Sequence, residues 1–311
     1  MIYVLCLNPA VDKIYHLHDF AAGKVYVGCK PEIYPGGKGV NVARVLSQLG
    51  AKVRLIGFLG EAGGDIVRND VEKYCECLFI RVPGSCRTTI NIIDDENKRE
   101  TVISEKGPQV DRQMGMLQLS AHIQTFVSEG DIVACSGSLA SGLPADAYAQ
   151  ISRLCEKIGA KCVLDCNVHT LPDSLDDARY ALGKPNEDEL CAMMGRCVTF
   201  DPQKIAEISR MLMPPYEKLL CSLGAAGGVL TTEKSVYYAK VPEVRVKSTV
   251  GSGDASFAGA LFAMDAGMDE VETLRLAMAC GAANAMNDAV GSVDKQTVEM
   301  LRKKIDVQKI G

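Results

Sequence analysis

Short apolar runs recur along the chain and predict the strands of a buried sheet. Residues 1–7 show no clean alternation of apolar and polar positions, which is typical of a strand buried on both faces. Similar runs, each followed by small or polar residues, occur at 52–60, 131–136, 161–165, 218–222 and 228–232. Helical spacing occurs between several of them, at 40–49, 145–158 and 202–213. This alternation predicts an α/β fold with a mostly parallel central sheet and helices on both faces.

Two segments, about 13–34 and 88–104, fit the alternation poorly. In the second, apolar residues flank a polar turn at 94–97. We expect extra strands here, forming a small β-sheet lid over a site at the carboxyl edge of the main sheet, where ligands collect in open α/β folds. Exposed strand edges seek partners, so this lid also predicts a homodimer. Because no linker is apparent, we expect residues 1–311 to form a single domain.

Composition and charge narrow the function classes. A net charge of −5 disfavours the dense basic surface that binding along nucleic acids requires. No stretch approaches the 18 consecutive apolar residues of a membrane span. The 13 cysteines are scattered, without the repeated CxxC spacing of a zinc site. We therefore expect mostly buried thiols in a cytoplasmic protein that binds small molecules, with no nucleic-acid or membrane partner.

The most informative segment is a glycine-flanked acid, Gly251-Ser252-Gly253-Asp254, at the start of a helix of small residues. The glycines allow a tight turn with outward-pointing N–H groups, and the helix N-terminus adds positive potential. Such a turn can hold an anion. Asp254 could accept a proton from a hydroxyl while the amides stabilise a phosphoryl group in transfer. An Asp that caps the helix, with glycines serving the turn, explains the pattern equally well.

A second glycine cluster opens another helix and contains Gly37, Lys38, Gly39 and Asn41. The glycines leave room for a ligand, while Lys38 and Asn41 offer a cation and an amide to phosphate and hydroxyl groups. The cluster is not a Walker A loop, because Gly39 stands where Ser or Thr would hold Mg²⁺. The alternative is a flexible turn with an exposed lysine.

The third segment contains Asn186 and Glu189, three residues apart. Side chains at this spacing share a helix face and could position Mg²⁺ through water. An acidic first helical turn is the alternative interpretation.

These three segments, in this order, resemble the pfkB, or ribokinase-like, family of carbohydrate kinases, and the resemblance covers essentially the whole chain. It implies a three-layer ribokinase-like fold. The opening Asn8-Pro9-Ala10-Val11-Asp12, together with segments 101–110 and 136–139, resembles the branch that acts on hexose phosphates. The resemblance therefore implies ATP-dependent phosphorylation of a ketohexose phosphate, with fructose 1-phosphate first, and tagatose 6-phosphate or fructose 6-phosphate as alternatives.

The resemblance also implies roles for individual residues. Asp254 would be the catalytic base, and Gly251, Ser252 and Gly253 would receive the transferred phosphoryl group. The sugar phosphate would contact Asp12, Gly37, Lys38, Asn41, Arg87, Ser138 and, in some relatives only, Lys24. ATP would contact Asn186, Ser222, Gly224, Gly227 and Asn284. Mg²⁺ would be held through water by Asn186 and Glu189, and a monovalent cation is a further candidate cofactor.

Three positions depart from the family pattern. Ser252 stands where Ala is common, Ala255 where Ser is common, and Cys86 precedes Arg87 where Thr is usual. None of these changes removes the base, the amides or the arginine. Ser252 is expected to alter local hydrogen bonding.

Other functions fit less well. A dinucleotide-binding oxidoreductase would carry GxGxxG after the first strand, where this chain has the segment 8–12. A non-catalytic sugar-phosphate sensor on the same fold would be expected to lose Asp254 or the adjacent glycines, and both are present. A zinc hydrolase is disfavoured because the four histidines form no HExxH motif.

Overall fold

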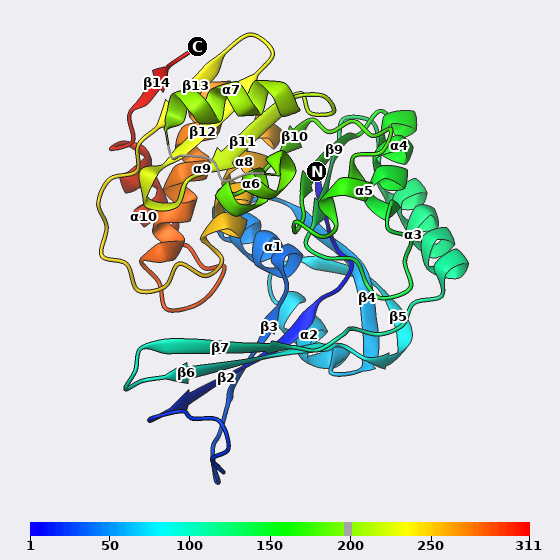
Figure 1. The fold of residues 1–311 in the computed structure, drawn as a ribbon. Helices are drawn as coiled ribbons and strands as arrows, with labels where there is room; N and C mark the ends of the chain where they lie inside the picture. Colours follow the sequence, from blue (N-terminus) through cyan, green and yellow to red (C-terminus); the bar gives the residue numbers. More distant parts are fainter. Residues whose placement is uncertain (196–200) are drawn as a thin grey trace.

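The computed structural model of the protein describes residues 1–195 and 201–311, and within them one large sheet dominates the fold (Figure 1). This ten-stranded sheet runs, in spatial order, β14 (Val307–Lys309), β13 (Val236–Ala239), β12 (Gly228–Thr232), β11 (Lys218–Ser222), β10 (Leu182–Gly183), β9 (Lys161–Asp165), β8 (Ile132–Ser136), β1 (Ile2–Cys6), β4 (Val53–Ala62) and β5 (Glu76–Ser85). Pairing is parallel from β5 to β11 and antiparallel from β11 to β14. The predicted, mostly parallel sheet is confirmed.

Helices cover both faces of this sheet. One face carries α1 (Lys38–Leu49), α2 (Gly64–Val71), α8 (Ser252–Asp265), α9 (Glu270–Ala285) and α10 (Lys295–Arg302). The other carries α3 (Arg112–Phe126), α4 (Ala147–Ile158), α5 (Leu171–Ser174), α6 (Glu187–Met194) and α7 (Pro202–Leu212). A short 3₁₀ turn, η1 (Gly224–Ala226), joins β11 to β12.

Strand β1 shows why its sequence lacks alternation. Ile2, Val4 and Cys6 pack into the core on one face of the sheet. Tyr3 and Leu5 pack into the core on the other face. A central strand covered on both sides needs apolar residues at every position, and this was the basis for predicting it.

A second, four-stranded sheet projects from the body at the bottom of Figure 1. Its order is β3 (Glu32–Gly36), β2 (Ala10–Leu17), β6 (Arg87–Asp94) and β7 (Arg99–Ser104), with β2 and β6 parallel and both outer pairs antiparallel. The predicted extra strands are confirmed, although β2 begins earlier than expected and 18–31 forms no strand.

The parallel register gathers polar residues at one edge of the large sheet. Ser136 and Asp165 end the neighbouring strands β8 and β9, and Lys184 directly follows β10. Helices α1 and α8, which pack together, follow the two glycine clusters. The chemistry-bearing segments therefore converge, as expected for the carboxyl edge of a parallel sheet.

Three expectations from composition can be compared with the described residues. None of the helices described is both long and apolar enough to cross a membrane. Most of the cysteines that the structure describes are buried, as predicted. Within 1–195 and 201–311, no group of three or more His, Cys, Asp or Glu side chains is placed to hold a metal ion directly.

Candidate active site

Close packing explains the glycines that precede and begin α1. Gly37 is the N-cap and has φ of 106°, a conformation that favours glycine. A Cβ placed on Gly39 would lie 2.5 Å from the Cβ of Cys6 in β1, so α1 approaches the strand too closely for Ser or Thr there. Lys38 forms ion pairs, so the alternative of a flexible turn with an exposed lysine is wrong.

Asp254 lies in the first turn of α8 but does not cap it. Gly251 is the N-cap, in the left-handed region with φ of 78°, and no side chain caps this helix. The Asp254 carboxylate is 7% exposed and accepts a hydrogen bond from Asn41 Nδ2 at 2.8 Å. The interpretation of Asp254 as an N-cap is therefore wrong. The first-turn amides of α8, including that of Gly253, have no acceptor within the helix.

The surroundings of Asp254 tune its proton affinity. Burial raises the pKa of this carboxyl to about 6, and the nearby charge of Asp165 acts in the same direction. Lys38, the Asn41 hydrogen bond and Lys184 oppose the rise. A carboxylate with this pKa is mostly ionised at neutral pH and is a better proton acceptor than an ordinary aspartate.

Two lysines and two acids form a charge cluster beside Asp254, and all but the partly exposed Lys38 are buried. Lys38 Nζ lies 3.0 Å from Asp165 Oδ1 and 3.3 Å from Glu189 Oε1. Lys184 Nζ lies 3.5 Å from Asp165 Oδ2. Burial lowers the pKa of Lys38, but the charges of Asp165 and Glu189 outweigh it, so the net pKa is raised and this lysine stays protonated.

The sequence did not single out Asp165 or Lys184 as site residues. Both are nearly fully buried, and Lys184 Nζ would lie 3.6 Å from a Cβ placed on Gly253. A cation therefore lies beside the amides that begin α8. The available signal was their position, because each stands at the carboxyl end of a buried parallel strand.

Asn186 and Glu189 are brought together as a capping box at the start of α6. Asn186 Oδ1 accepts from the backbone N–H of Glu189 at 2.8 Å, and Glu189 Oε2 accepts from the backbone N–H of Asn186 at 2.9 Å. The helix-terminus interpretation is thus confirmed, and it leaves the metal prediction untested. Carboxylate and amide oxygens suit Mg²⁺, and because the oxygens of Asn186 and Glu189 already accept hydrogen bonds, the ion would reach them through its water ligands. The donor set fits Mg²⁺ bound through water.

A cavity of about 160 Å³ lies between the N-terminus of α1 and the ends of β1 and β8. Its lining contains four of the predicted sugar-phosphate residues, Gly37, Lys38, Arg87 and Ser138. The other lining residues are Cys6, Asn8, Ser136, Gly137 and Asn167. Buried polar atoms of Asn8 (Oδ1), Arg87 (Nε) and Ser136 (Oγ) have no hydrogen-bond partner among the described residues. An anionic ligand that also carries hydroxyl groups would supply acceptors for Arg87 and Ser136 and a donor for the Asn8 oxygen.

The other predicted sugar residues lie outside the lining of this cavity. Asn41 faces Asp254, which places it next to the candidate base. Asp12 on β2 lies under Gly36, where a Cβ would come within 1.9 Å of its carboxylate, and burial raises the pKa of Asp12. Lys24 lies on the loop between β2 and β3 and pairs with Asp19 at 2.6 Å. Within its own chain, Lys24 is therefore not part of the cavity.

The predicted nucleotide residues divide into two groups. Ser222 forms an isolated parallel β-bridge with Asn186, and Gly224 begins the turn η1 after β11. Gly227 has φ of 103° and packs so closely that a Cβ would lie 1.9 Å from the carbonyl oxygen of Ala239. These residues lie together near the start of α6.

Asn284 instead holds the loop that precedes α8. Its Nδ2 donates to the carbonyl of Val250 at 2.9 Å and to Ser252 Oγ at 3.1 Å, and its Oδ1 accepts from the N–H of Ser292 at 3.0 Å. Ser252, which departs from the family pattern, thus provides one of the acceptors for Asn284. The expected effect of Ser252 on local hydrogen bonding is seen here.

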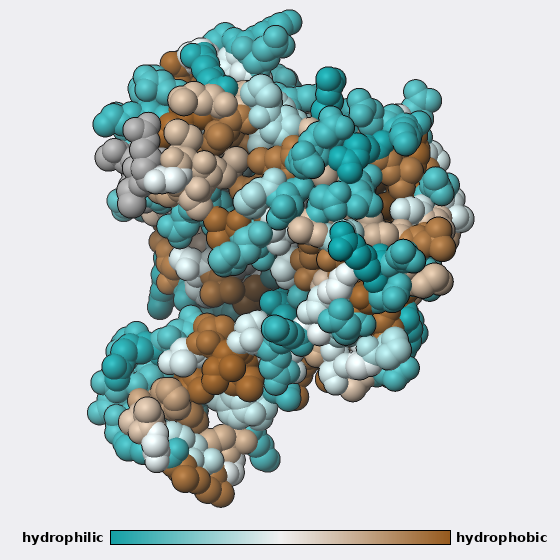
Figure 2. Space-filling model, turned by 45° about the vertical axis from the view of Figure 1, so that its right-hand side comes forward, coloured by the Kyte–Doolittle hydropathy of each residue, from teal (hydrophilic) through white to brown (hydrophobic). Residues whose placement is uncertain are grey.

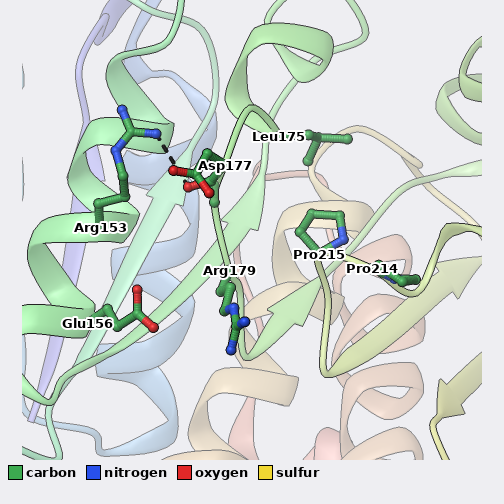
Figure 3. Close-up of a pocket in the computed structure, with 8 residues that line it drawn as sticks. Arg153, Glu156, Leu175, Asp177, Arg179, Pro214 and Pro215 are labelled. Atoms are coloured by element: carbon green, nitrogen blue, oxygen red, sulfur yellow. Dashed lines mark hydrogen bonds between the residues drawn. The ribbon is translucent and has the colours of Figure 1, made fainter.

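A second cavity, of about 400 Å³, shares no residue with the first (Figure 3). It is lined by Arg153 and Glu156 of α4, residues 175 and 177–179 before β10, and Pro214 and Pro215 before β11. The last two segments lead into the amino ends of β10 and β11, so this cavity lies at the opposite edge of the sheet from Asp165. Arg153 donates to the backbone carbonyls of Asp176 and Asp177, so this arginine stabilises the loop.

A comparison with known protein families covers all of these segments. The family model described as pfkB family carbohydrate kinase matches residues 6–295. The chain belongs to the pfkB family of carbohydrate kinases. It is thus a phosphotransferase of a family that uses ATP, and the resemblance stated from its motifs is confirmed.

Two curated pfkB relatives match over nearly their full length. The 1-phosphofructokinase of Bacillus subtilis is 30% identical over 313 residues, covering 100% of both chains. The tagatose-6-phosphate kinase of Staphylococcus epidermidis is 32% identical over 310 residues, covering 99% of both. The two relatives, which are named for different activities, are thus similarly close to this chain.

A solved structure confirms the family fold. Escherichia coli phosphofructokinase-2 in complex with potassium superposes with a TM-score of 0.90 at 21% identity, covering 97% of this chain and 98% of the other. The same enzyme is known in a tetrameric inhibited form, with a TM-score of 0.89 and 22% identity over the same shares. The expected ribokinase-like arrangement of this pfkB kinase is therefore correct.

Proposed function

We propose that this pfkB kinase transfers the γ-phosphoryl group of ATP to fructose 1-phosphate, forming fructose 1,6-bisphosphate, with Asp254 as the general base. The observation that carries the proposal is the buried Asp254 carboxylate, which is mostly ionised at neutral pH and lies beside Lys184 and the Gly253 amide, which has no acceptor within the helix. The Bacillus relative supports the choice of sugar. The Staphylococcus relative supports tagatose 6-phosphate as the alternative substrate.

Each group at the site has its own role in the proposed reaction. Asp254 accepts the proton of the sugar hydroxyl as the oxygen of that hydroxyl attacks the γ-phosphorus, and the bond to ADP breaks. The amides at Gly251, Ser252 and Gly253, with Lys184 beside them, stabilise the negative charge on the transferring group. Asn41 holds Asp254 in place for this transfer.

The acceptor's existing phosphate belongs in the 160 Å³ cavity in this proposal. Arg87 and Lys38 provide two cations at its wall, which suits a dianion. Ser138 and the neighbouring backbone add polar contacts. Asp12, which lies on the four-stranded sheet, is proposed to contact sugar hydroxyls. Lys24 is proposed as a further phosphate contact, although in this structure it pairs with Asp19 and lies outside the lining of the cavity.

The nucleotide is proposed to bind near Asn186, Ser222, Gly224, Gly227 and Asn284. Bound Mg²⁺ would neutralise phosphate charge, with Asn186 and Glu189 holding its water ligands. The potassium complex of the Escherichia coli relative supports testing a monovalent cation as well.

The described chain is proposed to act as a single kinase domain in the cytoplasm. The four-stranded sheet, from segments 13–34 and 88–104, would be the lid. Figure 2 shows apolar side chains gathered on the projection that this sheet forms. Large apolar residues exposed there are Val25, Val27, Ile33, Tyr34, Val102 and Ile103. A second copy of the chain is the proposed partner for this surface, supported by the oligomeric relative.

An ADP-release assay with three sugar phosphates tests the substrate assignment. Fructose 1-phosphate, tagatose 6-phosphate and fructose 6-phosphate are compared by kcat/KM under identical conditions. We expect the highest value with fructose 1-phosphate. A higher value with tagatose 6-phosphate would select the alternative, and no ADP release with any of the three would support a non-catalytic sensor.

A further inference from the structure

Arg44 connects the candidate base to three other parts of the molecule. It stands one helical turn after Asn41 on α1, and its side chain is only 17% exposed. One guanidinium nitrogen, Nη1, donates to Asn41 Oδ1 at 3.3 Å and to the carbonyl of Val290 at 3.0 Å. The other, Nη2, donates to the carbonyl of Pro35 at 3.3 Å and to Asp70 Oδ2 at 3.3 Å.

These contacts determine which way the Asn41 amide points. An amide has an oxygen that accepts and a nitrogen that donates, whereas a guanidinium can only donate. Arg44 therefore selects the Asn41 orientation in which Oδ1 faces the guanidinium. The nitrogen then faces Asp254 and donates at 2.8 Å. In the opposite orientation, an amide oxygen would face the carboxylate and no hydrogen bond could form.

The remaining contacts of Arg44 fix its position. The Pro35 carbonyl belongs to β3 of the four-stranded sheet, and Asp70 belongs to α2. Val290 lies beside the loop that begins α8, because a Cβ on Gly251 would come 2.9 Å from Val290 Cγ1. The guanidinium group of Arg44 thus links Asn41 to three surrounding segments, namely β3, α2 and the segment that contains Val290. A single ammonium group cannot reproduce four donated bonds in this geometry.

We propose that Arg44 is a positioning residue for phosphoryl transfer, acting through Asn41 to keep a hydrogen-bond donor on the carboxylate of Asp254. The proposal rests on the proposed function of Asp254 as the base. Arg44 itself touches neither Asp254 nor the cavity lining. Its contribution is to align the group that does touch the base.

The proposal predicts a direction for the pH profile. The hydrogen bond from Asn41 lowers the pKa of Asp254, so losing that bond raises the pKa further above its ordinary value. The charged groups that face Asp254 are Asp165, Lys38 and Lys184, and Arg44 forms no hydrogen bond or ion pair with any of them. A base with a higher pKa loses activity at a higher pH. The acid limb of kcat/KM should therefore move upward.

The experiment compares Arg44→Gln and Arg44→Lys with the wild-type chain. We expect the acid limb to move up by about one pH unit in both variants, as for loss of a hydrogen bond to a charged group. Arg44 also lies over the Tyr74 ring, at 5.6 Å from its centroid. Arg54→Gln is the matched control, because Arg54 likewise pairs with an acid, Glu76, and lies over an aromatic ring, but at the amino end of β4, away from the site. Its acid limb should stay at the wild-type position.

Arg44→Lys separates geometry from charge. An unchanged profile in Arg44→Lys, with a shift only in Arg44→Gln, would show a long-range charge effect and overturn the positioning role. Combination with Asn41→Ala gives a second test: if Arg44 acts through Asn41, Arg44→Gln should add little shift in that background. A full additional shift would contradict the proposal.

Asp254→Asn distinguishes failure of this inference from failure of the proposed function. Normal turnover in Asp254→Asn would show that Asp254 is not the base and would end both claims. A nearly inactive Asp254→Asn, together with wild-type pH profiles in both Arg44 variants, would overturn the positioning role alone. Thermal unfolding of each variant, followed beside the kinetics, verifies that the measured samples are folded.

Discussion

Replacing Asp254 with Asn is expected to stabilise the folded chain. The carboxyl is buried, and its pKa is raised from an ordinary 3.8 to about 6. A group with a raised native pKa favours folding most when it is protonated in both states, below its unfolded pKa. That contribution is lost as the pH rises through the native pKa. The native state therefore carries the cost of burying this charge at neutral and alkaline pH.

The size of the effect follows from the two pKa values. Their difference, about 6 minus 3.8, is about 2 units. At 1.36 kcal/mol per unit, the charge costs the wild-type fold about 3 kcal/mol above pH 6 as an upper bound. Asparagine has the same shape and no charge, and its amide oxygen can still accept from Asn41. The variant should thus be more stable at pH 8 by up to about 3 kcal/mol, with no advantage near pH 3.

Urea unfolding at pH 8 and at the lowest pH where both proteins fold measures this difference. Asp188→Asn is the control, because Asp188 also lies in a first helical turn but is exposed, and its stability change should be small at every pH. An Asp254→Asn variant that is less stable than wild type at pH 8, or equally stable at both pH values, would refute the account of a costly buried charge. A higher unfolding free energy in Asp254→Asn at pH 8 would show that the wild-type chain is less stable than it could be because it keeps a charged group at a functional position.

Three further perturbations follow from the geometry. Arg87→Ala should raise KM for the sugar phosphate about tenfold or more and leave KM for ATP unchanged, and a change in the ATP value would contradict the cavity assignment. Arg81→Ala, on an exposed arginine of the preceding strand β5 in the other sheet, should alter neither value. Gly39→Ala should lower unfolding free energy by about 1–3 kcal/mol in urea, because the new Cβ meets Cys6; a stable variant would refute the close packing of α1. If the four-stranded sheet joins two copies of the chain, as proposed, Val102→Glu on its exposed surface should give a monomer in sedimentation measurements, and an unchanged oligomer would exclude this surface as the interface.

The strands and glycine-led helices could be predicted because their signals are local. The buried run of β1 and the glycines before α1 and α8 identify these elements without knowledge of their neighbours. The limits of the four-stranded sheet were less accessible. Asp12 is predicted only as part of the motif 8–12. In the structure it lies within β2 and pairs with Tyr34 of β3 and Thr89 of β6, and only these long-range pairings show that the strand includes it.

The candidate site was predictable where a residue lies within a motif and not where it depends on strand order. Asp165 pairs with both Lys38 and Lys184, and Lys184 reaches it only because β9 and β10 are neighbours in the sheet. The same limit applies to Arg44, whose acceptors come from segments far apart in sequence. Asn284 illustrates the opposite case, since its motif position is clear but its amide binds the α8 loop.

The rate of phosphoryl transfer in Asp254→Asn tests the central claim most directly. Single-turnover measurement at pH 8, with saturating ATP and sugar phosphate, isolates the chemical step from product release. The account predicts a fall of several orders of magnitude with nearly unchanged ATP affinity, because the base is lost while the nucleotide contacts remain. A rate within tenfold of wild type would contradict the assignment of Asp254 as the catalytic base.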